Sequence, residues 1–176
     1  MSPSQNAMAL IRAFDLNMPP AKDKESFRLQ SQLFLDAVAP YTAAVASLLA
    51  GSDPRSLTTQ NRFDALLSVA YDVGIEVLVD SALPGLLGRC VPKSAVSAAF
   101  LSIPAFEDTL RDELQEQMQC YRLPLLPRRH FELELFNGNV YFTIGRTRER
   151  DGSIVYAPSV LHPMYRFLMV SASSRR

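Results

Sequence analysis

The stretch on which the expected fold depends is His130-Phe-Glu-Leu-Glu-Leu-Phe136, followed by Asn137-Gly138-Asn139 and then by Val140-Tyr-Phe-Thr-Ile144. Apolar and polar residues alternate on both sides of the Asn-Gly pair. Such alternation places the apolar set on one face of a strand. Asn-Gly favours a tight turn because both residues tolerate a positive φ. The pattern therefore predicts a β-hairpin with an apolar face, which needs a covering layer to be stable in water.

Apolar residues at helical spacing upstream of this stretch predict the covering layer. A stripe that includes Phe34 predicts a helix over residues 24–50, and Pro40 should kink or break it because proline removes an N–H group. A second helix is expected from about residue 58 to residue 81. Shorter helical stretches follow between residues 92 and 122, so we expect three to four helices in this layer.

A second turn signal, Asp151-Gly152, extends the expected hairpin. It separates residues 146–150 from residues 153–157, which predicts a three-stranded antiparallel meander. Residues 159–170 could then form a short closing helix. The expected fold class is therefore α+β, with an N-terminal helical layer packed on a C-terminal three-stranded meander.

The expected domain organisation is one domain with two short ends. Residues 1–23, with prolines near both ends, predict a flexible N-terminal arm, and within it residues 8–14 could form one or two helical turns. Residues 24–170 are expected to form a single α+β domain. Residues 171–176 are expected to form a polar tail.

Composition indicates a soluble globular protein. Hydrophobic residues make up 48% and charged residues 20% of the 176 residues, which is ordinary for such proteins. No apolar run suggests a bilayer span, and we see no signal peptide. The two cysteines do not make a disulfide framework, which favours a reducing compartment. We therefore expect an intracellular protein, in the cytoplasm or the nucleus, that does not bind a membrane.

The net charge is zero, but the charges are unevenly placed along the chain. Residues 1–121 carry 9 Lys and Arg against 14 Asp and Glu, whereas residues 122–176 carry 9 against 4. The basic C-terminal part either binds a polyanion or attracts the acidic helical part of its own chain. We favour the second interpretation.

Alternating arginines suggest the nucleic-acid alternative. Arg146, Arg148 and Arg150 share one strand face by their spacing, and Arg128 and Arg129 should lie nearby. Basic groups with aromatic neighbours on a sheet can bind phosphates and stack on bases. The RNA-recognition consensus is absent, and a charged edge strand protected from aggregation has the same pattern.

A short segment before the first long helix resembles a known peptide motif. Asp15-Leu16-Asn17-Met18-Pro19-Pro20 is similar to the Asp-Leu-Asn-x-x-Pro repression motif of plant transcriptional regulators. That resemblance implies an extended peptide that docks in a groove of a corepressor, with Asp15, Leu16, Asn17 and Pro20 as the matching residues. Interpreted from the residues alone, the segment is an irregular arm ended by two prolines, and both interpretations stay open here.

Three carboxylates lie at steps of four in the second expected helix. Asp72, Glu76 and Asp80 should therefore share one helix face. Aligned carboxylates can hold a divalent cation, but such a site needs oxygen ligands from a second element. We expect a solvated acidic face.

No recognised catalytic or cofactor motif is present in the sequence. The chain lacks a dinucleotide fingerprint, a phosphate loop and a nucleophile elbow. The two histidines and two cysteines (His130, His162, Cys90 and Cys120) show no zinc-ligand spacing. We therefore expect no cofactor or metal, and a non-enzymatic protein-interaction or regulatory module. The alternatives are a nucleic-acid-binding module and an enzyme with a dispersed site.

Overall fold

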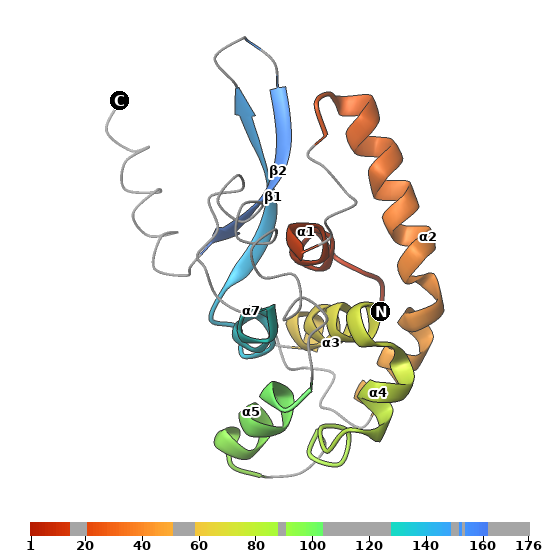
Figure 1. Cartoon of the computed structure of the whole chain (residues 1–176), viewed down its shortest axis with the longest axis vertical. Coiled ribbons are helices and arrows are strands. Elements are labelled where there is room, and N and C mark those ends of the chain that lie inside the picture. The colour runs from red at the N-terminus through yellow and green to blue at the C-terminus, as the bar shows by residue number, and fades with distance from the viewer. Residues whose placement is uncertain are drawn as a thin grey trace, which may run out of the picture.

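The computed structural model describes residues 1–14, 21–50, 59–87, 91–103, 128–148, 152 and 154–161. These residues are mostly helical, with one small antiparallel sheet (Figure 1). The elements, in chain order, are α1 (Gln5–Phe14), α2 (Lys24–Leu49), α3 (Thr59–Val73), α4 (Ile75–Asp80), α5 (Lys93–Leu101), α7 (Arg128–Phe136), β1 (Tyr141–Arg148) and β2 (Ile154–Leu161).

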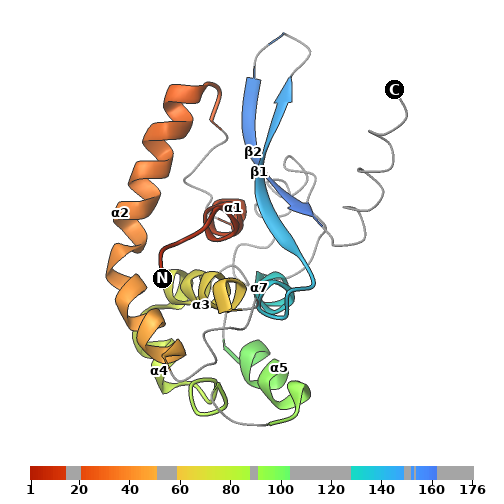
Figure 2. The same ribbon diagram turned by 180° about the vertical axis from the view of Figure 1, so that it is seen from behind.

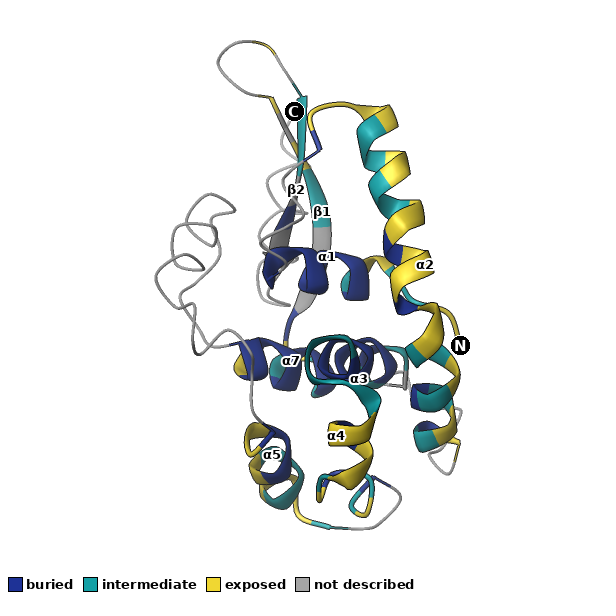
Figure 3. Ribbon diagram, turned by 45° about the vertical axis from the view of Figure 1, so that its right-hand side comes forward, coloured by how far each residue is buried: buried dark blue, intermediate teal, exposed yellow. Residues whose placement is uncertain are grey.

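The helices α1, α3 and α7 form the centre of the molecule. α1 lies between the hairpin and α3, and α3 packs on α7 (Figures 1 and 2). α2 runs along one side of this centre and packs on α3, while α5 packs on α7. Colouring by burial shows α1, α3 and α7 almost wholly enclosed, whereas one long side of α2 is exposed (Figure 3).

The N-terminal segment is part of the core, and the expectation of a flexible arm is wrong for residues 5–14. These residues form α1, and every residue from Ala7 to Phe14 is buried. The physical reason is the apolar run from Ala7 to Phe14, which only Arg12 interrupts, because removing so many apolar side chains from water is strongly favourable. Phe14 packs against Phe131 of α7, with ring centroids 5.8 Å apart. Residues 15–20 lie outside the described residues.

The expected first strand, residues 130–136, is instead helix α7, so this part of the hairpin prediction is wrong. Asn137-Gly138 ends this helix and does not form a hairpin turn. Gly138 has φ 74°, its N–H donates to the carbonyl of Leu135 (2.9 Å), and the Asn139 N–H donates to the carbonyl of Glu134 (2.9 Å). This is the glycine-dependent C-terminal turn known as the Schellman motif. Arg128, Arg129 and Glu132 are buried together with the apolar residues of α7, so apolar positions are not confined to one face and an alternating pattern can belong to this helix.

The hairpin of the structure lies at the second turn signal, Asp151-Gly152, and not at Asn137-Gly138. β1 pairs with β2 antiparallel, from Tyr141 opposite Leu161 to Arg148 opposite Ile154. The Asp151-Gly152 signal falls in the connection between them, and Gly152 has φ 86°. The three-stranded meander is not confirmed, because its first strand is α7. Residues 159–161, placed in a closing helix by the sequence, belong to β2, and residues 162–176 lie outside the described part of the chain.

Helix α2 is continuous through Pro40. This proline is exposed, so the backbone groups that it disturbs face solvent and α2 does not break there. Asp23 caps the start of the helix, because its carboxylate accepts a hydrogen bond from the Ser26 N–H (2.7 Å). That bond and a second from the Ser26 hydroxyl hold the pKa of Asp23 below its usual value.

The second expected helix is divided at Gly74. α3 ends at Val73 and α4 begins at Ile75, because Gly74 has φ 90°, a conformation that other residues rarely adopt. The apolar spacing that predicts this helix includes Phe63, Leu66 and Leu67, and all three are fully buried in α3.

The enclosure of α1 leads to a stability prediction. Leu10→Ala should lower the free energy of unfolding by about 2–5 kcal/mol, because Leu10 is fully buried and the smaller residue leaves a cavity. Chemical denaturation followed by circular dichroism measures this loss. Leu101→Ala, at an exposed position of α5, is the control and should change stability by about 0.5 kcal/mol or less. Equal, small effects of both substitutions would contradict the placement of α1.

Candidate functional site

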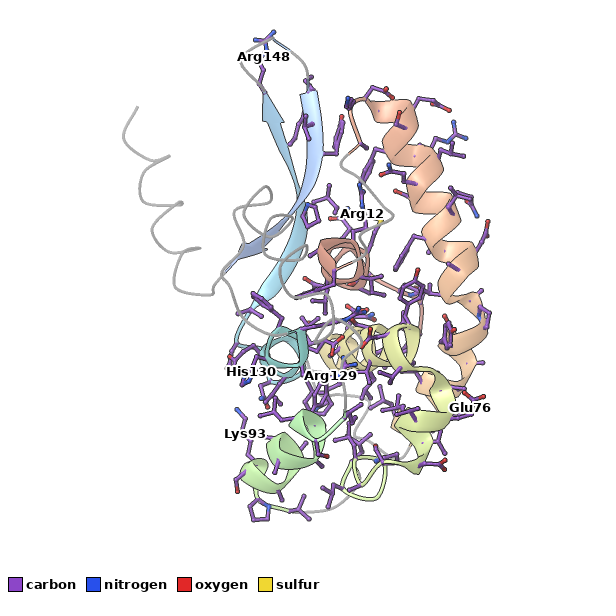
Figure 4. All side chains as sticks on the ribbon, viewed as in Figure 1. Arg12, Glu76, Lys93, Arg129, His130 and Arg148 are labelled. Atoms are coloured by element: carbon purple, nitrogen blue, oxygen red, sulfur yellow. The ribbon has the colours of Figure 1, made fainter. Side chains whose placement is uncertain are left out.

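Charged side chains from α3 and α7 meet in the protein interior. Arg128, Arg129 and Glu132 come from the first turns of α7, and Asp72 comes from the last turn of α3. Arg128 and Arg129 are 5% and 4% exposed, and Glu132 is fully buried. We call these four residues the buried charge cluster. Figure 4 shows Arg129 directed from α7 into the interior, whereas His130 points away from it.

Each arginine in the buried charge cluster contacts both carboxylates. Arg128 donates from Nη1 to Asp72 Oδ1 (3.1 Å) and from Nε to Glu132 Oε1 (2.9 Å). Arg129 forms ion pairs with Glu132 and with Asp72 through its own Nη1 and Nη2. The two positive and two negative charges therefore balance one another. Such pairing offsets the cost of removing charges from water.

Neighbouring groups complete the hydrogen bonding of the buried charge cluster. The Ser68 hydroxyl donates to Glu132 Oε1 (2.5 Å), and Arg128 Nη2 donates to the Ser68 carbonyl (3.1 Å). The Arg128 guanidinium also lies over the ring of Phe14, 5.6 Å from its centroid. Interactions with α1, α3 and α7 therefore all converge on one arginine.

This arrangement suits a structural role better than catalysis. Both carboxylates are engaged by guanidinium groups, and arginine does not lose its proton in proteins. Arg128 and Arg129, which the nucleic-acid hypothesis assigned to a binding surface, are thus enclosed in the interior. The sequence contains the relevant signal, because Arg128 and Arg129 lie four and three residues before Glu132, the spacing of helical ion pairs.

The arginines of β1 lie in a different part of the molecule. Arg146 and Arg148 are exposed, and Arg148 lies toward the tip of the hairpin, far from Arg129 (Figure 4). Tyr156 pairs directly with Arg146 across the two strands, which agrees with the expectation that an aromatic residue lies nearby. Arg150 is outside the described residues.

The exposed side of α2 carries large apolar side chains. Leu29 and Leu33 are 61% and 55% exposed. By helical spacing they share a face with exposed Ala37 and Pro40, and with Asp36 between them. We call these five residues the outer face of α2. By length and composition alone α2 could also cross a bilayer, a test that core helices of soluble proteins and signal sequences pass as well.

The three carboxylates expected on one helix face are separated by the break at Gly74. Asp72 turns into the buried charge cluster, whereas Glu76 and Asp80 are exposed on α4. These two line a shallow groove of about 400 Å³ together with Val77, Ser81, Ala82, Ser102 and Ile103. Within the described residues, no group of three or more His, Cys, Asp and Glu side chains is placed to hold a metal ion. His130 is exposed, and Cys90, Cys120 and His162 lie outside the described part.

Another buried carboxylate, outside the buried charge cluster, binds the start of the chain. Asp64 of α3 accepts hydrogen bonds from the Ser4 N–H (3.2 Å), the Ser4 hydroxyl and Gln60 Nε2 (2.9 Å). Burial raises the pKa of Asp64 above its ordinary value, although these three hydrogen bonds act in the opposite direction. Ser4 also accepts from the Asn6 N–H (3.0 Å), so it caps α1.

Comparison with the models of protein families, with curated proteins and with solved structures gives no match. Function is therefore inferred from the residues of this chain alone.

The buried charge cluster predicts a large cost for losing one partner. Glu132→Ala should lower the free energy of unfolding by about 3–5 kcal/mol, because it leaves two buried guanidinium groups with one carboxylate. Thermal or chemical unfolding measures the change. The matched control is Glu134→Ala on the same helix, which loses only an exposed hydrogen bond from Asn139 and should cost about 1 kcal/mol or less. A Glu132→Ala variant as stable as the control would contradict the enclosure of the cluster.

Asp64 predicts a pH dependence of stability. Because the pKa of Asp64 in the folded protein is above the ordinary 3.8, the folded state binds this proton more tightly than the unfolded state does. The contribution of Asp64 to stability is therefore greatest at low pH and is lost as pH rises through the raised pKa. Asp64→Asn removes this dependence because an amide does not ionise. The amide can still accept from Ser4 and Gln60 and can donate to the Ser4 hydroxyl, so the local hydrogen bonds are kept.

The measurement is the free energy of unfolding of both proteins between pH 3.5 and pH 7. The stability of Asp64→Asn relative to the parent should increase with pH. A constant difference across this range would show that the pKa of Asp64 is not raised.

Proposed function

We propose that this chain is a non-enzymatic protein-interaction module whose partner docks on the outer face of α2. The observation that supports this function is the exposure of Leu29 and Leu33, four residues apart on one helix face. Removing two such side chains from water stabilises a complex by about 1.5–3 kcal/mol each when burial is complete. Groove-and-helix complexes commonly use anchors at this spacing.

The polar residues of the same face favour a protein over a bilayer. Asp36 lies three residues after Leu33 and accepts a hydrogen bond from Gln32 Nε2 (3.0 Å) on the exposed surface. A carboxylate forced into hydrocarbon lacks a partner and is costly there. A protein surface can instead supply a basic side chain or a bridging water beside the apolar contact. The partner therefore presents apolar side chains flanked by a cation.

The proposal of a non-enzymatic role rests on the state of four acidic groups of α3, α4 and α7. Asp72 and Glu132 are neutralised by arginines inside the protein, and Glu76 and Asp80 are exposed on α4. Exposure leaves those two carboxylates without the environment that tunes a catalytic acid or base. We further propose an intracellular location, which is supported by the absence of a disulfide framework.

The segment Asp15–Pro20 is proposed as a second partner-binding element, on the basis of its resemblance to the repression motif alone. Its two flanks are both anchored. Phe14 is buried in the core, and Ala21 pairs with Tyr156 of β2. A corepressor that takes this segment would therefore dock beside the hairpin.

Site-specific photo-crosslinking tests the interaction through α2. A benzophenone amino acid at position 33 should give a crosslinked product in native extract, because Leu33 lies on the proposed docking face. The matched control is position 35, since Leu35 is also an exposed leucine of α2 (44%) but lies about 160° around the helix from Leu33.

The prediction is a product from position 33 that is at least several-fold stronger than that from position 35 and that disappears with Leu29→Ser. Leu29→Ser should not change the unfolding midpoint, because the side chain is exposed. A product at twice the chain mass would identify the partner as a second copy. Equal crosslinking from both positions would contradict a specific docking face.

A further inference from the structure

The start of α2 and the hairpin are held together by backbone pairing. The Tyr156 N–H donates to the Ala21 carbonyl (2.8 Å), and the Ala21 N–H donates to the Tyr156 carbonyl (3.3 Å). Since Arg146 pairs with Tyr156 on its other side, the three residues form one row across the hairpin. Adjacent members of such a row are about 5 Å apart, so Ala21 lies about 10 Å from Arg146.

An aromatic contact fixes the same junction. The ring of Phe27 on the first turn of α2 stacks on the ring of Tyr156, with centroids 5.0 Å apart and planes 20° apart. Both rings are half-buried. Arg12 of α1 lies on the ring of Phe27 from the interior, 5.7 Å from its centroid. The first turn of α2 therefore has a defined position beside β2, as Figures 1 and 2 show from opposite sides.

Cations from distant parts of the sequence flank this junction. Lys22 follows Ala21, Lys24 and Arg28 lie at the start of α2, Arg146 pairs with Tyr156, and Arg148 lies two residues further along β1. These cations are all exposed, and none forms an ion pair with another residue in the described parts of the chain. We call them the basic end: Lys22, Lys24, Arg28, Arg146 and Arg148.

Two carboxylates, Asp23 and Glu25, lie among these cations. Among the described residues of this region, five cations against two anions leave a charge of +3. Asp23 already caps α2 through Ser26 and so cannot also neutralise the lysines on either side fully. The basic end is thus a cationic surface beside two stacked aromatic rings.

We propose that the basic end binds the phosphodiester backbone of single-stranded nucleic acid. Guanidinium groups match phosphate oxygens by paired hydrogen bonds. Because the ring of Phe27 is covered by Tyr156 and by Arg12, an unstacked base would contact the ring of Tyr156. A single strand offers both its phosphates and its bases, whereas a duplex hides the bases. The nucleic-acid site expected from the sequence included Arg128 and Arg129, which are buried; the site proposed here has Lys22, Lys24 and Arg28 in their place. It does not depend on the proposed partner of α2.

An anionic bilayer fits the same cations less well. The outer face of α2 follows directly after Arg28, and a bilayer that covered both would receive Asp36 with the leucines. An acidic peptide can pair with the cations, but it has no bases to stack on the aromatic ring beside them. The two alternatives are therefore outcomes of the test.

The experiment measures binding of the full chain to a fluorescent mixed-sequence 12-nucleotide RNA by anisotropy, from 50 to 300 mM salt. The parent should bind, and its affinity should fall steeply with salt because phosphate contacts release counterions. Arg146→Glu combined with Arg28→Glu should weaken binding at least about tenfold and lower the salt slope by about two units, roughly one per lost contact.

Charge-matched controls separate local contact from net charge. Lys93→Glu and Arg146→Glu change the net charge equally, but Lys93 lies on α5, at the opposite end of the molecule from the hairpin tip (Figure 4). Lys93→Glu should change affinity less than about twofold, whereas Arg146→Glu should change it several-fold. Unchanged unfolding midpoints, expected because all three positions are exposed, show that these variants are folded.

Two further probes identify the ligand class. Vesicles of phosphatidylserine and phosphatidylcholine, and a poly-glutamate peptide of the same formal charge as the RNA, should bind at least tenfold more weakly than the RNA. Equal binding of either probe would overturn the assignment to nucleic acid. Absence of RNA binding at 50 mM salt, or equal effects of Lys93→Glu and Arg146→Glu, would overturn the site itself.

Discussion

The contact between α3 and α7 depends on the neutralisation of four charges away from water. Arg128 and Arg129 each bridge Asp72 and Glu132, so no charge in the buried charge cluster lacks a counter-charge. Buried ion pairs add little net stability compared with apolar packing, but removing one member is costly. The pairing therefore specifies which faces of the two helices meet. Through the ring of Phe14, the same cluster also positions α1.

A short break in the chain makes this geometry available. Asp72 lies two residues before Gly74, where the left-handed backbone ends α3. Glu76 and Asp80 then follow a different helix axis and stay in solvent. One glycine thus separates a carboxylate that organises the interior from two that do not. The aligned acidic face expected from spacing alone does not form.

Much of the fold could be predicted from the sequence, and the failures have physical causes. Helix α2 and the buried stripe of α3 follow from their apolar spacing. Residues 130–136 were misassigned because an alternating pattern also fits a short helix in which one of the polar side chains, that of Glu132, is buried in ion pairs. The burial of α1 was missed because the prolines near both ends of residues 1–23 indicated an irregular arm, although residues 7–14 are mostly apolar. Arg128 and Arg129 were placed on a surface for the related reason that charge alone does not distinguish an exposed arginine from a paired one.

The two surfaces with proposed roles differ in how readily a sequence reveals them. The leucines of α2 could be recognised only once α3 was seen to cover the opposite side of that helix. The basic end joins residues more than 115 positions apart, from Arg28 to Arg146, through the pairing of Ala21 with Tyr156. The spacing of residues predicts which side chains share a face within one helix or strand. It does not predict which residues of two distant elements lie side by side.

The position of α1 also determines the order in which the protein can acquire its structure. α1 lies more than 100 residues before α7 and the hairpin in the chain, yet it packs against both. Contacts between such distant segments close large loops and form slowly. The enclosure of α1 by α7 and the hairpin is therefore expected to be a late step in folding, and until then part of its apolar surface is exposed to aggregation.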